Sequence, residues 1–205
     1  VVAGAAVVPT ALALGVSMTA LQFAIGALND LHDVPTDGAR VPPKPIPAGL
    51  VPPDVARAVV VGASLVGLVL AAPFGTGLLV LAGIGLAIGV AYDLAARGTR
   101  WSWLPFAVGI PILPVYGWFG ATGGLPGWLA ALIPAAALAG AAIAVANARA
   151  DHERDHATGV ETIATALGDG GSRAALVSAG AGAGGIALAW IVGVGGSLEH
   201  LVPVL

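Results

Sequence analysis

Two acidic clusters, far apart in the chain, repeat one spacing: an asparagine, an aspartate four residues later, and a second aspartate after four more. The first cluster is Asn29, Asp33 and Asp37, and the second is Asn147, Asp151 and Asp155. The chain has only eleven Asp and Glu residues, so the repetition is a distinctive feature. On an α-helix, residues four apart share a face, where like charges repel each other. A divalent cation would relieve that repulsion, which makes both clusters candidate metal sites.

Carboxylate and amide oxygens are ligands that suit Mg²⁺, and this ion commonly completes its coordination with water and substrate phosphates. The two clusters therefore suggest two Mg²⁺ positions that flank one diphosphate group. The chain has no cysteine, which argues against zinc, and we interpret His32, His152 and His156 as solvated or as supports for the ligands. The alternative is that both clusters are hydrated loop ends. We expect Pro35 to end the first helix, so that Asp37 reaches in from a loop.

Basic residues suited to a phosphate ester lie between the clusters. Arg40 and Lys44 belong to a proline-rich loop, and Arg97 and Arg100 follow the third apolar stretch. An arginine can bind phosphate through two parallel hydrogen bonds, whereas a lysine acts as a point charge. Tyr92 either donates a hydrogen bond to a leaving oxygen or anchors the chain at a membrane interface, and the residues alone leave both possibilities open.

The elements that must position these residues are membrane helices. The chain of 205 residues is 58% hydrophobic and 9% charged, with a mean hydropathy of +0.95, whereas soluble domains carry roughly 25% charged residues. A membrane-spanning helix needs about 20 mostly apolar residues. This length predicts an all-α, multi-pass transmembrane bundle with spans at 5–31, 55–72, 77–94, 102–120, 127–148 and 173–194.

Counting the spans places three polar loops, 29–54, 93–101 and 149–172, on the same side of the membrane. Every lysine and arginine lies in or beside these loops. Basic residues favour the cytoplasmic side of short loops, so we expect the protein to be integral to the membrane with these loops in the cytoplasm. Orientation alone is a sufficient alternative explanation for Arg57 and Arg173, which border spans. It does not explain the acidic residues, which gather there as well.

Together these motifs resemble the UbiA superfamily of intramembrane prenyltransferases. The resemblance covers roughly residues 20–170 and rests on four stretches: N-D-x-x-D-x-x-x-D at 29–37, Arg40 with K-P-I-P-A-G at 44–49, Y-D-x-x-x-R at 92–97, and D-x-x-x-D at 151–155. The family has nine helices, with its acidic motifs after the second and sixth. Here they follow the first and fifth spans, so the resemblance implies a single, partial transmembrane domain over 1–205 that matches helices two to seven. The chain also departs from the family in Lys44, where arginine is common, and in Arg97, where lysine is frequent.

The resemblance also implies roles for individual residues. Metal binding falls to Asn29, Asp33, Asp151 and Asp155, and diphosphate binding falls to Arg40, Lys44, Arg97 and Arg154. Asp37 would assist the acceptor. The implied reaction is Mg²⁺-dependent transfer of a prenyl group from a polyprenyl diphosphate, with release of diphosphate. The implied partners are that donor, a small-molecule acceptor and membrane lipid, with no nucleic acid. Family frequency favours an aromatic quinone precursor as the acceptor.

One stripe of the first span, formed by Gln22, Gly26, Asn29 and Asp33, is expected to face the substrate cavity. Two other functions remain as alternatives. A CDP-alcohol phosphatidyltransferase would also use aspartates and a metal, but Asp37-Gly38-Ala39-Arg40 lacks the spacing of its motif. A transporter or noncatalytic assembly subunit would place ionisable groups in the middle of the membrane, whereas this chain keeps them at one boundary.

Overall fold

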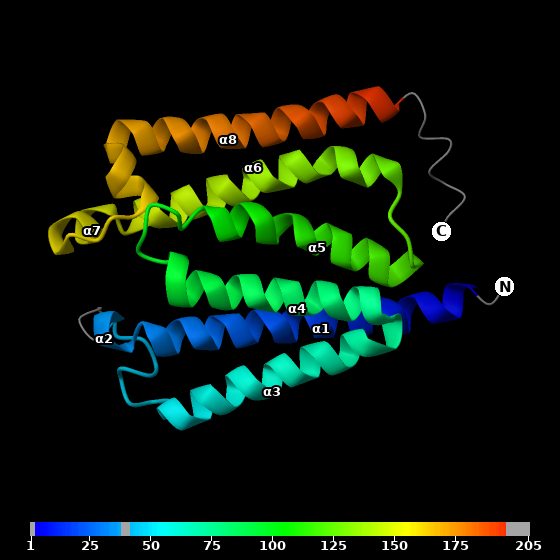
Figure 1. The fold of residues 1–205 in the computed structure, drawn as a ribbon, viewed down its shortest axis with the longest axis horizontal. Helices are drawn as coiled ribbons and strands as arrows, with labels where there is room; N and C mark the ends of the chain where they lie inside the picture. Colours follow the sequence, from blue (N-terminus) through cyan, green and yellow to red (C-terminus); the bar gives the residue numbers. More distant parts are fainter. Residues whose placement is uncertain (1–2, 38–41, 196–205) are drawn as a thin grey trace. The chain divides into compact units, whose positions relative to one another are not determined.

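Helices are the only regular secondary structure in the part of the chain that the structure describes. This structure, a computed structural model, describes residues 3–37 and 42–195, and side chains within 8–35 and 42–193. The elements (Figure 1) are α1 (Ala3–His32), α2 (Val34–Asp37), α3 (Pro53–Ala71), η1 (Ala72–Phe74), α4 (Thr76–Ala91), the π-helical turn η2 (Tyr92–Ala96), α5 (Leu104–Thr122), α6 (Gly127–Ala150), α7 (His152–Thr158) and α8 (Ile163–Gly195).

Six of these helices are long and apolar enough to cross a membrane, which confirms the predicted all-α, multi-pass fold. The sixth span begins earlier than predicted, because α8 starts at Ile163 and not at 173. Gly168 interrupts α8 with φ 67° and ψ 175°, a backbone conformation that glycine adopts without a steric cost. The glycine-rich sequence that we interpreted as a loop is therefore a kink between two helical segments. Pro111 and Pro114 are accommodated inside α5.

The expected effect of Pro35 is wrong. The first helix ends at His32, and Pro35 lies inside α2, a single helical turn that extends to Asp37. Proline is tolerated in the first turn of a helix, because a backbone N–H at that position would have no helical partner. Asp37 therefore belongs to a helical turn and not to a loop, while its side chain lies outside the described part of the chain.

The chain forms two compact units. The N-terminal unit comprises residues 5–95 and 116–123, and the C-terminal unit comprises residues 1–4, 96–115 and 124–205. The N-terminal unit thus contains α1, α3, α4 and the last turns of α5. The C-terminal unit contains the first turns of α5 together with α6, α7 and α8. Each unit contains one of the two acidic clusters.

A buried hydrogen-bond chain stabilises the N-terminal unit. The Ser17 hydroxyl on α1 donates to the carbonyl oxygen of Gly67 on α3 at 2.7 Å, and the Ser17 oxygen lies 2.6 Å from the Tyr116 hydroxyl on α5. Because serine has one hydroxyl hydrogen, Tyr116 must be the donor in the second bond. Both side chains are buried, and polar groups within a membrane require such partners.

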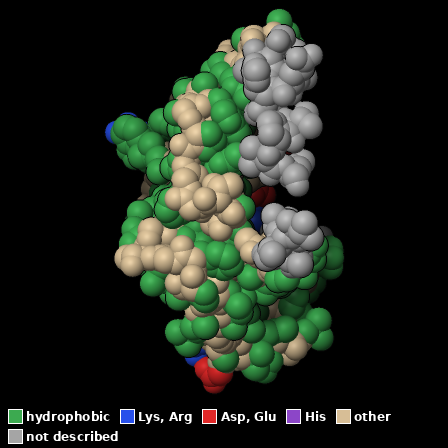
Figure 2. Space-filling view, turned by 90° about the vertical axis from the view of Figure 1, so that its right-hand side faces the viewer, with side chains coloured by type: hydrophobic (Ala, Val, Ile, Leu, Met, Phe, Trp, Pro, Cys, Tyr) green, Lys and Arg blue, Asp and Glu red, His purple; other side chains and the backbone are tan. Residues whose placement is uncertain are grey.

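Small residues bring the helices of the C-terminal unit close together. The helices α6 and α8 pack along each other, with alanines such as Ala135, Ala142 and Ala144 buried on α6. Gly140 of α6 lies directly against the backbone of Phe106 on α5, where a β-carbon would collide with the carbonyl group. Large apolar side chains remain exposed along the helices, among them Val69, Leu188 and Val192. Figure 2 shows the right-hand side of Figure 1, where hydrophobic groups are also widespread. This distribution is typical of a protein surrounded by lipid.

Candidate active site

In the N-terminal unit, the first acidic cluster is linked to the end of α4. The side-chain nitrogen of Asn29 donates to the Asp93 carboxylate at 2.9 Å. Asp93 belongs to the π-helical turn Tyr92–Ala96 and is only 1% exposed. Because the amide hydrogens of Asn29 are directed at Asp93, its carbonyl oxygen is the atom that remains for a ligand. Turns of π-helix are frequent at functional sites.

Two further carboxylates of this cluster share one cation. The ammonium of Lys44 lies 2.9 Å from Asp30 Oδ1 and 3.4 Å from Asp33 Oδ2. The backbone N–H of Asp33 donates to the carbonyl oxygen of Asn29 at 3.0 Å, so helical geometry continues past the end of α1. Asn29, Asp30 and Asp33 therefore lie on adjacent turns. Lys44, predicted to bind phosphate, contacts carboxylates in this arrangement.

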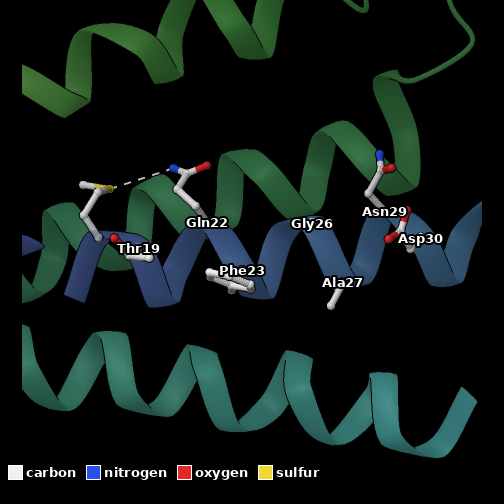
Figure 3. A pocket seen from close by; sticks show the side chains of 8 residues that line it. Thr19, Gln22, Phe23, Gly26, Ala27, Asn29 and Asp30 are labelled. Atoms are coloured by element: carbon white, nitrogen blue, oxygen red, sulfur yellow. Dashed lines mark hydrogen bonds between the residues drawn. The ribbon is translucent and has the colours of Figure 1, made fainter. Parts of the chain in front are cut away.

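A groove follows α1 away from the cluster. Its volume is about 650 Å³, and it is lined by Met18, Thr19, Gln22, Phe23, Gly26, Ala27, Asn29 and Asp30. Gln22 and Asn29 project from the same side of the helix (Figure 3), and the Gln22 side chain donates to the sulfur of Met18 at 3.8 Å. The predicted stripe of Gln22, Gly26 and Asn29 does line this groove. Asp33, the fourth member of the stripe, is buried and does not.

In the C-terminal unit, the second cluster spans a break between two helices. The helix α6 ends at Ala150, Asp151 has φ −102° and ψ 8°, and α7 begins at His152. Asn147 therefore lies on α6, Asp151 lies at the break, and Asp155 lies on α7. Helical spacing does hold between the two aspartates, since the Asp155 N–H donates to the Asp151 carbonyl at 2.9 Å.

Asp155 is the carboxylate with the most perturbed environment in this cluster. Burial raises the pKa of Asp155, and the nearby charge of Asp151 raises it further. Arg154, His152 and Arg97 act in the opposite direction. The predicted cation Arg97 and the predicted ligand Asp155 are thus close enough to interact within the same unit. Gly98 lies against Val160, which places the segment after Arg97 beside the segment after α7.

Arg149, to which the sequence analysis gave no individual role, connects the end of α6 to α8 next to the second cluster. Nη1 of Arg149 donates to the Asp169 carbonyl at 2.9 Å and to the Ser172 hydroxyl at 2.5 Å. Nη2 donates to the Asp169 carboxylate at 2.8 Å. These bonds join the end of α6 to the segment of α8 that follows the Gly168 kink. Because Arg149 comes before Asp151 and its partners come after Asp155, these bonds connect the two ends of the segment that carries both aspartates.

The structure brings some of the predicted residues together. Asn29, Asp33 and Lys44 gather in the N-terminal unit, as Arg97 and Asp155 do in the C-terminal unit. Tyr92 opens the π-helical turn, and Arg154 lies beside Asp155 on α7. Arg40 and the side chain of Asp37 lie outside the described part. Because the clusters belong to different units, their binding of one common diphosphate stays a prediction.

The oxygen donors in these clusters fit Mg²⁺. Asp30 and Asp33 already contact one cationic group, the Lys44 ammonium, at short range. Among the side chains that the structure describes, no three His, Cys, Asp or Glu residues form a group that could hold a metal by themselves. A Mg²⁺ ion bound here would therefore take its remaining ligands from water, Asn29 or a phosphate, as this ion commonly does.

Two residues of the site were missed as contributors by the sequence analysis. Asp30 was noted only within its motif, although its spacing of three from Asp33 places both on one helix face. Asp93 was noted as part of Y-D-x-x-x-R, but nothing in the sequence indicates that it accepts a hydrogen bond from Asn29, 64 positions away. Its burial could be found only from the fold.

Comparison with known proteins identifies the family. The profile of the UbiA prenyltransferase family matches residues 1–205. The chain belongs to this family. A solved apo structure of a UbiA homologue from Aeropyrum pernix K1 has the same fold, with a TM-score of 0.78 and 24% sequence identity, and the match covers 91% of this chain and 71% of that one. The search of curated proteins found no match.

The match to the UbiA family includes both acidic clusters. This UbiA-family chain is an integral membrane protein of a prenyltransferase family, with six helices capable of spanning a bilayer. The family assignment removes the CDP-alcohol phosphatidyltransferase alternative. The stretches that carried the resemblance coincide with the polar segments that contain Asn29, Asp33, Lys44, Arg97 and Asp155.

Proposed function

We propose that this chain transfers a prenyl group from a polyprenyl diphosphate to a small acceptor and releases diphosphate in a Mg²⁺-dependent reaction. The observation that carries this proposal is that Asn29 and Asp30 line one end of the groove along α1, in a chain of the UbiA family. The buried Asp33 joins them through Lys44, which contacts both aspartates. The site offers hard oxygen ligands at one end and an apolar path at the other. A diphosphate with an apolar tail has the matching distribution of charge.

The ligands of Mg²⁺ would be Asn29 and Asp33 in the N-terminal unit and Asp151 and Asp155 in the C-terminal unit. Bound there, Mg²⁺ would stabilise the negative charge that develops on the leaving diphosphate. Asp93 would support this set by orienting the amide of Asn29.

The cationic side chains would bind the diphosphate oxygens. We assign this role to Arg97 and Arg154, which lie beside Asp155, and to Lys44 and Arg40. Tyr92 would donate a hydrogen bond to the leaving oxygen. Together these donors would hold the diphosphate while the bond between the allylic carbon and oxygen breaks, with the electron pair leaving on oxygen.

The groove would shelter the rest of the donor. Its lining is mainly apolar along the part of α1 that precedes Asn29, where it includes Met18, Phe23, Gly26 and Ala27. Excluding water from this path would preserve the allylic cation until the acceptor attacks it. A new bond then forms between the allylic carbon and the acceptor, which loses a proton, and Asp37 would assist at this stage. We favour an aromatic quinone precursor as the acceptor, and we place the polar loops in the cytoplasm.

The direct test is release of diphosphate from a labelled polyprenyl diphosphate by membranes that contain this protein, with and without Mg²⁺. We expect release that requires both Mg²⁺ and an acceptor, and we expect Asp33→Asn and Asp151→Asn to abolish it. A matched control is Glu153→Gln, because Glu153 is an exposed carboxylate on α7 beside the proposed ligands. Membranes that bind the donor but never release diphosphate with any aromatic, isoprenoid or glycerol-phosphate acceptor would favour a noncatalytic role.

A further inference from the structure

The position of Lys44 requires an explanation beyond phosphate binding. Its ammonium lies between two carboxylates of the first acidic cluster, 2.9 Å from Asp30 and 3.4 Å from Asp33. The Lys44 side chain is 23% exposed, and the Asp33 side chain is 6% exposed. The ammonium therefore occupies the space beside the buried carboxylate that the proposed function assigns to a metal ion.

The backbone holds Lys44 in this place. The Ala48 N–H donates to the Lys44 carbonyl at 3.0 Å, and the Leu50 N–H donates to the Pro45 carbonyl at 2.9 Å. Prolines at 42, 43, 45 and 47 restrict the same loop further. The loop therefore presents the lysine to the end of α1 from a compact turn, so that only the flexible side chain needs to move for the ammonium to reach a different partner.

We propose that Lys44 is an internal counter-cation that competes with the divalent metal for Asp30 and Asp33, and that the metal–diphosphate pair displaces it onto the diphosphate. This inference rests on the proposed function. Mg²⁺ binds carboxylate oxygens at about 2.0–2.1 Å, so an ammonium and a metal ion on the same oxygens would repel each other. Once displaced, the ammonium remains tethered to the site and can contact the phosphate oxygens.

The arrangement gives Lys44 two opposite effects. It weakens the binding of metal alone, because the metal must displace a favourable ion pair. It strengthens the binding of metal in the presence of diphosphate, because the released ammonium gains a new partner. Metal and diphosphate then bind with positive coupling, and the site avoids holding a metal without its substrate.

The test measures binding directly and needs no turnover. Mn²⁺ serves as the probe, detected by its electron paramagnetic resonance signal, with the whole chain in lipid nanodiscs and with or without inorganic pyrophosphate. For Lys44→Met we expect Mn²⁺ alone to bind tighter by about threefold to tenfold, the scale of one or two partly exposed ion pairs. We expect the enhancement of Mn²⁺ binding by pyrophosphate to shrink by a similar factor.

Two controls separate contact from general charge. Arg57→Met removes a cation from an ion pair with Asp54 at the start of α3 and should leave both Mn²⁺ affinities unchanged. Lys44→Arg keeps the positive charge and should retain the competition. A double-mutant cycle of Lys44→Met with Asp30→Asn should show that the two effects on Mn²⁺ affinity are coupled. Asp30→Asn already removes one of the two ion pairs of Lys44, so Lys44→Met should then change the affinity less.

The outcomes distinguish this inference from the proposed function. If the wild-type chain binds Mn²⁺ but Lys44→Met binds it with equal or lower affinity, the competition is refuted and the proposed function stands. The competition is likewise refuted if Arg57→Met tightens Mn²⁺ binding as much as Lys44→Met does. If the wild-type chain binds no Mn²⁺, either alone or with pyrophosphate, the proposed metal site itself is wrong.

Discussion

Asn29 and Asp93 form a hydrogen bond of 2.9 Å that joins α1 to the π-helical turn after α4. The bond fixes which end of the Asn29 amide faces the carboxylate and which end is left for a ligand. Hydrogen bonds to charged groups contribute about 1.5–3 kcal/mol, enough to hold one orientation of a side chain. Asp93 is thus a candidate positioning residue whose effect on a ligand would pass through Asn29.

We predict that Asp93→Ala weakens Mn²⁺ binding about tenfold and lowers the rate of diphosphate release, because Asn29 loses the partner that orients it. Asp93→Asn retains an oxygen that can accept the same hydrogen bond and should keep most of the affinity. Titration of both variants with Mn²⁺, together with thermal unfolding, provides the measurement. Equal affinities for Asp93→Ala and the wild-type chain would show that Asn29 needs no such support.

We predict that Asp33→Asn and Asp155→Asn each reduce diphosphate release at least about a hundredfold, the scale of losing one group that stabilises transition-state charge. Adding excess Mg²⁺ should restore part of the rate if the defect lies in metal affinity. The control Glu153→Gln, on the same short helix as Asp155, should remain active. Normal activity in either aspartate variant would remove that residue from the proposed ligand set.

The raised pKa of Asp155, caused first by burial and then by Asp151, predicts a pH dependence. The pKa of this carboxyl group is higher in the folded chain than in the unfolded chain. The group therefore stabilises the fold fully at a pH below its unfolded pKa, and this stabilisation is lost as the pH rises through its folded pKa. Without divalent cations, stability should therefore decline as the pH rises above about 4. In Asp155→Asn this decline should be smaller, as measured by unfolding in detergent from pH 4 to 7.

Divalent metal should act against that decline, because it binds the deprotonated carboxylate. The affinity for Mg²⁺ should accordingly increase as the pH rises through the raised pKa of Asp155. Calorimetric titration at several pH values tests this directly. A Mg²⁺ affinity that is constant over the same range would mean that Asp155 does not bind the ion.

We predict that Gly140→Ala destabilises the C-terminal unit by about 1–3 kcal/mol, the usual cost of overpacking. The added methyl group would collide with the backbone of Phe106, which cannot move as a side chain would. Gly184→Ala on α8 is the matched control, because a β-carbon there meets nothing within 4 Å. Unfolding by heat in detergent should separate the two variants. Equal stabilities would mean that α5 and α6 can move apart at little cost.

Apolar length made the six spans predictable. The repeated spacing of asparagine and aspartate indicated the polar segments that form the candidate site. The failures have local causes. Pro35 fits the first turn of α2, and Gly168 bends α8 where a loop was expected. The contacts of Asn29 with Asp93 and of Lys44 with Asp30 join distant or loop residues through side chains. Periodicity along one helix carries no information about such contacts.

The bonds from Arg149 to Asp169 and Ser172 have a consequence for the smallest functional form of this protein. All of the acidic residues proposed to bind metal occur before α8 begins, so a chain cut after Thr158 would still contain every one of them. It would lack the carbonyl, carboxylate and hydroxyl that hold Arg149. The end of α6 and the whole of α7 would then be anchored on one side only. We therefore expect a working fragment to need the first turns of α8, well beyond Asp155, the last of the proposed metal ligands.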